Sequence, residues 1–314
     1  MDFFSNILGQ GKGANPAINQ GNTQFEAGNY TEAVKSFEKA LRVDPENGPV
    51  RLSMGRALAC LGRDGEAAEW LRKALDSSPG DAGILRALGH VLARTGDYQE
   101  AAECFATIVE KKPADTNAWY WRGEMLERLG RYADAAEAYA RALDGNSEDV
   151  VLQEKLARTL ERTGAYREAA VCFERILRAN PESAGAFARK GAALLYRGDY
   201  SGAVASFDRV LAGDPHNLDA LYGKARALEH LGRFQDAADC YGTITAADPG
   251  NTPALHHQGS LLLRSGGYAE ALECFDKVVL ADPDNMAARY SMGLVYDTLG
   301  RYDRAVKSFD HILK

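Results

Sequence analysis

The sequence predicts an all-α fold, an α-solenoid of about nine consecutive 34-residue helix-turn-helix repeats. Three observations predict it. A phrase such as "GRYADAAEAYARAL", which starts at Gly130, recurs along the chain, and each copy starts 34 residues after the previous one, as at Gly28, Gly62 and Gly96. A small residue returns at one fixed phase of this period, and a proline returns at another. With such a period each unit packs mainly against its neighbours, so one repeat body is expected rather than two or three globular domains.

Two parts of the chain are distinguished. Residues 1–13 are a short apolar segment followed by a Gly-rich linker, and residues 14–314 are the repeats. The repeats begin at residues 14, 48, 82, 116, 150, 184, 218, 252 and 286, and the ninth is cut short at Lys314. Places within a repeat are counted below from its first residue.

Each repeat is expected to hold two helices. In the fourth repeat, apolar or small residues fall at steps of three and four in both halves, which indicates one packed face per helix. These residues are Trp119, Gly123, Leu126, Ala135, Tyr139 and Ala142. Gly130 stands where a left-handed turn would end the first helix. In most repeats a proline closes the second helix. These prolines are Pro45, Pro79, Pro113, Pro181, Pro215, Pro249 and Pro283.

Small residues predict close contact between the two helices. Glycine recurs at place 8, where a glycine in mid-helix costs about 1 kcal/mol relative to alanine, so we expect close packing to compensate. These glycines are Gly21, Gly55, Gly89, Gly123, Gly191, Gly259 and Gly293, with Ala157 and Ala225 as exceptions. An aromatic residue after each turn, such as Tyr98, is expected to wedge between hairpins. Asp64 replaces it in the second repeat, which predicts a weaker joint there.

These small, tyrosine, alanine, aromatic and proline positions resemble those of the tetratricopeptide repeat family over residues 14–314. Asp64, Ser147 in place of proline, and the shortened last repeat depart from the pattern locally. The resemblance implies a right-handed superhelix whose inner wall is lined by the first helix of each repeat, with places 2, 5, 9, 12 and 13 facing a groove. It implies no known specificity: a chaperone-tail clamp would need lysine at Ile18, and the asparagine ladder of glycosyltransferase relatives is absent.

The predicted inner wall carries a ridge of basic residues beside an acidic line, with aromatic surface that includes Trp121. Places 5 and 12 hold most of the acids, and Arg86 is the one base there. The residues predicted to bind a partner in the groove are Arg56, His90, Arg94, Tyr120, Arg128, Arg158, Arg162, Tyr196, Tyr222, Arg226, Arg264 and Tyr290.

Two interpretations of this ridge stay open. In one, Glu154 pairs with Arg158 and Glu124 with Arg128 four residues along the same helix, which forms a structural salt-bridge ladder. In the other, guanidinium groups interleaved with tyrosines bind carboxylates of an acidic partner segment.

Composition argues against several classes of function. The chain has 37 basic and 44 acidic residues and a net charge of −7, which argues against a nucleic-acid binder. No apolar stretch reaches the roughly 20 residues of a membrane span. The start has no basic leader, so a cytoplasmic location is expected. The recurring cysteines are interpreted as small core residues without disulfides or zinc.

Other candidates for chemistry are weak. "GQGKG" at residues 9–13 lacks the spacing of a phosphate-binding loop. His230, His256 and His257 lie in adjacent repeats but have no supporting carboxylate pattern, so neither metal nor another cofactor is predicted. No Ser/His/Asp or Cys/His spacing matches a catalytic pattern, and enzyme activity is not expected. Apolar residues between Asp2 and Leu8 are expected to cap the first hairpin or to plug a groove.

The sequence therefore predicts a non-enzymatic scaffold for protein–protein interaction, with a partner peptide or helix, acidic in character, in the groove. A regulatory subunit that recruits substrates to a separate enzyme is the alternative, and a structural assembly protein is the third possibility. Weak self-association through the C-terminal helix is also expected, because Ile312 and Leu313 follow a helix that is only partly polar.

Overall fold

The computed structural model describes residues 15–312, and in this range the chain is helical with short turns and contains no strand. It divides into two compact units, residues 1–159 and 160–314. Unit 1 contains α1 (Pro16–Glu26), α2 (Tyr30–Val43), α3 (Gly48–Cys60), α4 (Asp64–Ser77), α5 (Ala82–Thr95), α6 (Tyr98–Lys111), α7 (Thr116–Arg128), α8 (Tyr132–Ala142), the 3₁₀ turn η1 (Leu143–Gly145) and most of α9 (Val150–Thr163). Unit 2 contains the end of α9, then α10 (Tyr166–Ala179), α11 (Ala184–Arg197), α12 (Tyr200–Gly213), α13 (Leu218–His230), α14 (Phe234–Ala247), α15 (Thr252–Ser265), α16 (Tyr268–Ala281), α17 (Met286–Thr298) and α18 (Tyr302–Asp310).

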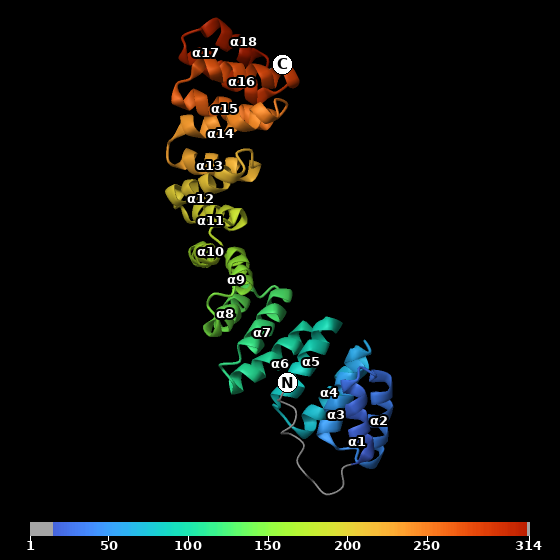
Figure 1. Cartoon of the computed structure of the whole chain (residues 1–314). Coiled ribbons are helices and arrows are strands. Elements are labelled where there is room, and N and C mark those ends of the chain that lie inside the picture. Colours follow the sequence, from blue (N-terminus) through green and yellow to red (C-terminus); the bar gives the residue numbers. More distant parts are fainter. Residues whose placement is uncertain (1–14, 313–314) are drawn as a thin grey trace. The chain divides into compact units, whose positions relative to one another are not determined.

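Within each unit the helices form consecutive hairpins. An odd-numbered helix packs against the even-numbered helix that follows it, as α3 does against α4 and α11 against α12 (Figure 1). Even-numbered helices also pack against the next odd-numbered one, as α6 does against α7 and α14 against α15. The predicted all-α solenoid of helix-turn-helix repeats is confirmed.

The ends of the helices follow from short polar side chains and glycine. Asp115 caps α7 because its Oδ1 atom accepts a hydrogen bond of 2.9 Å from the backbone N–H of Ala118. Asn, Asp or Ser plays the same part at α3, α5, α11, α13, α15 and α17. Gly130 follows α7 with a φ of 73°, a conformation that L-residues with side chains rarely adopt. The chain can therefore turn sharply between the helices of one hairpin.

The recurring small residues make room for rings of the second helix. A Cβ atom added at Gly123 would lie 2.7 Å from Tyr139 Cδ1, and one at Gly89 would lie 2.8 Å from Phe105 Cε2. The rings of Tyr139 and Phe105 are fully buried. In the second helix, the repeated alanines represented by Ala135 are buried as well. Close approach of ring to backbone explains why glycine recurs at place 8 despite its low helix propensity.

A polar side chain at place 4 donates a hydrogen bond to the loop between repeats, a contact that the periodic pattern alone does not predict. Arg51 Nε donates to the Pro45 carbonyl at 2.8 Å, and Trp119 Nε1 donates to the Pro113 carbonyl at 2.9 Å. Gln153 Nε2 donates to Ser147 in the same way at 2.9 Å. A buried carbonyl without a partner costs about 1–3 kcal/mol, so these donors stabilise the loops. The Oε1 atom of Gln153 is buried without a partner of its own.

Residues 15–312 include no helix with both the length and the apolar character that crossing a membrane demands. The thiols of Cys104, Cys172, Cys240 and Cys274 are free and buried. Burial raises the pKa of Cys104 to about 12 and that of Cys172 to about 11, so both thiols stay protonated at neutral pH. The N-terminal segment expected to cap or plug, and Leu313, lie outside the described residues.

Candidate functional site

At four joints the residue at place 13 contacts the residue at place 17 of the preceding hairpin. In unit 2 the Tyr196 ring stacks on that of Tyr166 with centroids 5.0 Å apart, and the His230 ring stacks on that of Tyr200 at 4.4 Å. The guanidinium carbon of Arg264 lies 3.9 Å from the centroid of the Phe234 ring. Three successive joints of unit 2 thus use ring–ring or cation–π contact. Arg264 and Tyr196, both predicted to bind a partner, also join hairpins.

Unit 1 replaces this ring contact with charges at one joint. Asp64 stands where the ring is expected, and Arg94 Nε donates to its Oδ2 atom at 3.2 Å. Arg94 Nη2 forms an ion pair with Asp64 and donates to the Ala59 carbonyl at 3.1 Å. At another place in the repeat, Arg56 lies over the ring of Phe25 from the preceding hairpin, with the guanidinium carbon 5.6 Å from the ring centroid. Part of the basic ridge is therefore engaged in holding hairpins together.

Neither ion pair predicted within a helix is formed in the described part of the chain, which corrects that expectation. Glu124 is bound by Lys155, from the next repeat, and by the hydroxyl of Tyr139, which donates to its Oε1 at 2.7 Å. Burial and the nearby carboxylates of Glu124 and Glu127 raise the pKa of Tyr139, so its hydroxyl stays protonated. Arg128 is exposed and forms no ion pair with any residue that the structure describes.

Like Arg128, neither Arg158 nor Glu154 forms an ion pair with any residue in the range 15–312. Both are exposed side chains of α9. Arg162 is also exposed, near the C-terminal end of the same helix.

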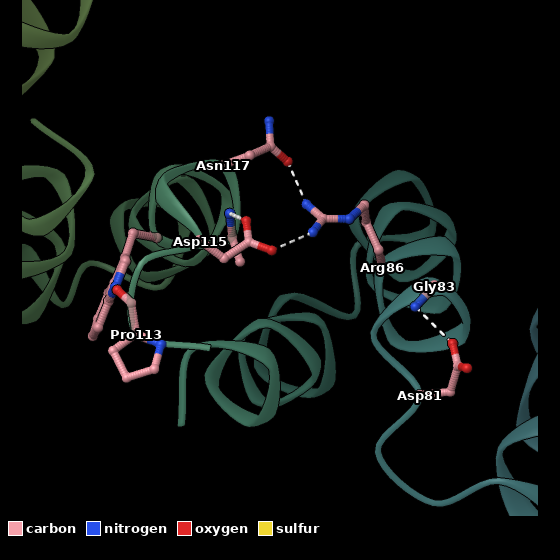
Figure 2. Close-up of polar contacts among 8 residues, drawn as sticks. Asp81, Gly83, Arg86, Pro113, Asp115 and Asn117 are labelled. Carbon is pink, nitrogen blue, oxygen red and sulfur yellow. Dashed lines mark hydrogen bonds and ion pairs between the residues drawn. The ribbon is translucent and has the colours of Figure 1, made fainter. Parts of the chain in front are cut away.

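A ladder of charges does exist, but it crosses between repeats. Arg189 pairs with Glu161 of the previous repeat in unit 2, as Lys155 pairs with Glu124 in unit 1. Figure 2 shows Arg86 of α5 reaching the start of α7, where Nη2 contacts Asp115 Oδ2 at 2.6 Å and Nη1 contacts Asn117 Oδ1 at 2.5 Å. The repeat period is needed to see these pairs, because their members lie 28 to 31 residues apart.

A pocket of about 390 Å³ in unit 1 brings together three of the predicted residues, His90, Arg94 and Arg128. The ring centroids of His90 and Trp121 lie 4.5 Å apart in an edge-to-face arrangement. Burial, with the charges of Arg86 and Arg94, lowers the pKa of His90, so the imidazole is neutral at pH 7. The pocket is lined by His90, Ala93, Arg94, Tyr98, Trp121, Glu124, Met125 and Arg128.

A second pocket, of about 220 Å³, lies in unit 2 and brings together Tyr196, Tyr222 and Arg226. It is lined by Ala188, Ala192, Leu195, Tyr196, Phe207, Asp219, Tyr222, Gly223 and Arg226. The other predicted residues line neither pocket: Arg56, Tyr120, Arg158, Arg162, Arg264 and Tyr290. Tyr120 packs near Tyr139 at 6.1 Å between centroids, and Tyr290 lies 5.7 Å from Phe309.

Among residues 15–312, no three His, Cys, Asp or Glu side chains are grouped so that they could hold a metal ion. The rings of His256 and His257 have centroids 6.3 Å apart, and His230 is stacked on Tyr200. The chemistry that the pockets offer is recognition: guanidinium groups for carboxylates and rings for apolar groups.

Comparison with known proteins agrees with this architecture. No curated protein sequence matches the chain at a significant level. Among solved structures, Naa15/Naa10 bound to HypK-THB is 13% identical over 95% of this chain and 62% of that one, with a TM-score of 0.65. A structure of MamA is 20% identical over 54% of this chain and 93% of that one, with a TM-score of 0.50. YrrB, described as a TPR protein with an unusual peptide-binding site, is 24% identical over 60% and 96%, with a TM-score of 0.47.

Sequence profiles described as "Tetratricopeptide repeat" match most of the chain. One matches residues 18–82, 86–150 and 257–314, and another matches residues 126–190 and 194–257. These matches cover both compact units and agree with the hairpins described above. The chain therefore belongs to the tetratricopeptide repeat family.

Proposed function

We propose that this protein is a non-enzymatic scaffold that binds an acidic segment of a protein partner on the first-helix side of its hairpins. Tetratricopeptide repeat proteins are protein–protein interaction scaffolds, which supports the general role. The acidic specificity is proposed because Arg128 is exposed and forms no ion pair in the described range. Its side chain lines a pocket together with His90 and Trp121.

The charges around Arg128 are already matched in pairs, which leaves its own charge available. Arg94 is neutralised by Asp64, and Glu124 by Lys155. A planar guanidinium can donate two parallel hydrogen bonds to the oxygens of a carboxylate. A partner carboxylate would therefore meet Arg128 without first breaking an ion pair of the protein.

The test uses a fluorescein-labelled peptide without an aromatic residue, Gly-Asp-Glu-Ala-Asp-Glu-Gly, and fluorescence anisotropy at low salt. Arg128→Ala should raise the Kd about fivefold, equivalent to roughly 1 kcal/mol for one partly exposed charge pair. Arg131→Ala is the matched control, because Arg131 is an exposed arginine already paired with Asp134 and outside the pocket. Equal loss of binding in both variants, or none in either, would reject Arg128 as the recognition residue.

A second role, weak self-association, is favoured by one observation at α18. Val306 is 56% exposed, whereas Val34 and Ala238, at the same place in earlier repeats, are 4% and 1% exposed. Val306→Lys should reduce any concentration-dependent scattering of the protein, and a strict monomer at high concentration would remove the proposal. We also propose a reducing, cytoplasmic location on the ground of the five free cysteines.

A further inference from the structure

The pocket of unit 2 lies at a joint where the repeat lacks a side chain that other joints have. At three joints, the residue at place 6 packs on the buried ring of the preceding second helix. Trp121 stacks on Phe105 with centroids 6.3 Å apart, and the guanidinium carbon of Arg189 lies 5.1 Å from the Phe173 centroid. His257 stacks on Tyr241 in the same way, with centroids 5.4 Å apart.

At the joint between α12 and α13 the corresponding residue is Gly223, and the corresponding ring is Phe207. The ring lies so near the glycine that an added Cβ would be 2.4 Å from Phe207 Cζ. Residue 223 thus contributes no planar group, and both residues line the pocket of about 220 Å³. Ala188 and Ala192 of α11 also line the pocket, and their short side chains leave space in it.

The size and walls of this pocket suit one aromatic ring. A cavity of about 150 Å³ lined by apolar side chains is large enough to hold benzene. Tyr196 and Tyr222 offer further ring surface, and aromatic pairs gain stability beyond the area that they bury.

Polar groups at the same pocket suit the chain that would carry such a ring. Arg226 is exposed, lies 6.0 Å from the Tyr196 ring centroid, and has no ion pair among residues 15–312. Asp219 is exposed as well and can accept a hydrogen bond from a partner backbone N–H.

We propose that this pocket receives an aromatic side chain of an extended partner segment, with an adjacent carboxylate of that segment bound by Arg226. The partner's ring takes the part at Gly223 that the protein's own indole, guanidinium and imidazole take at the three other joints. This inference rests on the proposed function, because it specifies that the acidic partner segment also contains an aromatic residue.

The first measurement compares the peptide Gly-Asp-Glu-Phe-Asp-Glu-Gly with its counterpart that has alanine in place of phenylalanine. The wild-type protein should bind the phenylalanine peptide at least about tenfold more tightly, the factor expected for burying one aromatic side chain. Ala192→Leu fills the pocket and should bring the ratio close to one, with the affinity for the alanine peptide unchanged. Gly223→Trp is avoided because its Cβ would collide with Phe207.

Ala184→Leu is the matched control, since Ala184 is an exposed alanine of the same helix that does not line the pocket, and it should keep the preference. Circular dichroism checks that both variants remain folded. Equal affinity of the wild-type protein for the two peptides overturns the proposal, as does a preference that survives in Ala192→Leu.

A second measurement separates failure of the pocket from failure of acidic recognition. The protein with ¹³C-labelled alanine methyl groups is titrated with N-acetyl-phenylalaninamide, a probe without a carboxylate. The methyl resonances of Ala188 and Ala192 should shift, whereas that of Ala184 should not. Shifts without any peptide binding would support the pocket and reject the acidic partner. Peptide binding without a phenylalanine preference and without these shifts would reject the pocket and leave the acidic partner standing.

Discussion

Arg94 of α5 binds Asp64 of α4 at the position where Arg264 of α15 binds the ring of Phe234. The two pairs occupy equivalent places in their repeats, 30 residues apart in each case. One joint is therefore closed by opposite charges and the other by cation–π contact, and an arginine stands at place 13 in both.

This equivalence predicts that Asp64→Tyr changes stability little. The ion pair is half exposed at Arg94, and such pairs contribute about 0.2–1 kcal/mol, which is also the range of an exposed cation–π contact. The free energy of unfolding, measured by urea denaturation, should stay within about 0.5 kcal/mol of wild type. Asp64→Ala should lose more than Asp64→Tyr. A gain well above 1 kcal/mol for Asp64→Tyr would show that the aspartate weakens this joint, as the sequence alone suggested.

Two glycine substitutions should have opposite effects. Gly123→Ala places a Cβ 2.7 Å from Tyr139, and overpacking of this kind costs about 1–3 kcal/mol. Gly185→Ala, in the first turn of α11, meets no atom within 4 Å and should stabilise the protein by about 0.4–1 kcal/mol. The melting temperatures of the two variants should move in opposite directions. A stabilised Gly123→Ala would contradict the account of place 8.

Gln153→Arg should stabilise unit 1. Gln153 donates to the Ser147 carbonyl but leaves its own Oε1 buried without a partner, which costs about 1–3 kcal/mol. Arginine has donors and no acceptor, and Arg51 already fills the same place by donating to Pro45. We expect a gain of about 1 kcal/mol in urea denaturation. The reverse change, Arg51→Gln, should destabilise, because it also removes the hydrogen bonds to Lys73 and Ser77.

Two partly buried histidines should make stability fall in acid. Burial lowers the pKa of His90, as do the charges of Arg86 and Arg94, and burial with the charge of His257 lowers that of His256. The unfolded chain therefore binds protons more readily than the folded one near the unperturbed pKa of about 6.5. The stability that neutral imidazoles allow is complete above this pH and is lost as the pH falls through the lower folded pKa values.

The measurement is the free energy of unfolding between pH 8 and pH 5, compared with a His90→Gln, His256→Gln double variant. The variant cannot titrate at these positions, so its curve should be flatter over this window. Parallel curves would show that other groups cause the acid dependence.

The hairpins could be predicted because the same pattern of small, aromatic and apolar residues recurs every 34 residues. Gly123 and Tyr139 show this, since a small residue and a ring at fixed phases imply contact between the two helices. The polar pairs were harder. Glu124 has an arginine four residues later, yet it binds Lys155 from the next repeat. Spacing within a helix favours the local pair, whereas packing between repeats decides the outcome.

The candidate site was predictable only in part for the same reason. Arg128, His90 and Trp121 were named from their places in the repeat, but the pocket that unites them depends on how α5 and α7 of consecutive hairpins pack. Gly223 gave no signal as a residue of interest, because its importance comes from the absence of a side chain beside Phe207.

The charged joint at Asp64 has a consequence for how the protein responds to its medium. Salt screens opposite charges at a surface, while it leaves the stacking of Tyr200 on His230 nearly unaffected. High salt should therefore weaken the joint between the second and third hairpins and leave the stacked-ring joints of unit 2 unchanged. Amide hydrogen exchange in α4 and α5 should then become faster as the ionic strength rises.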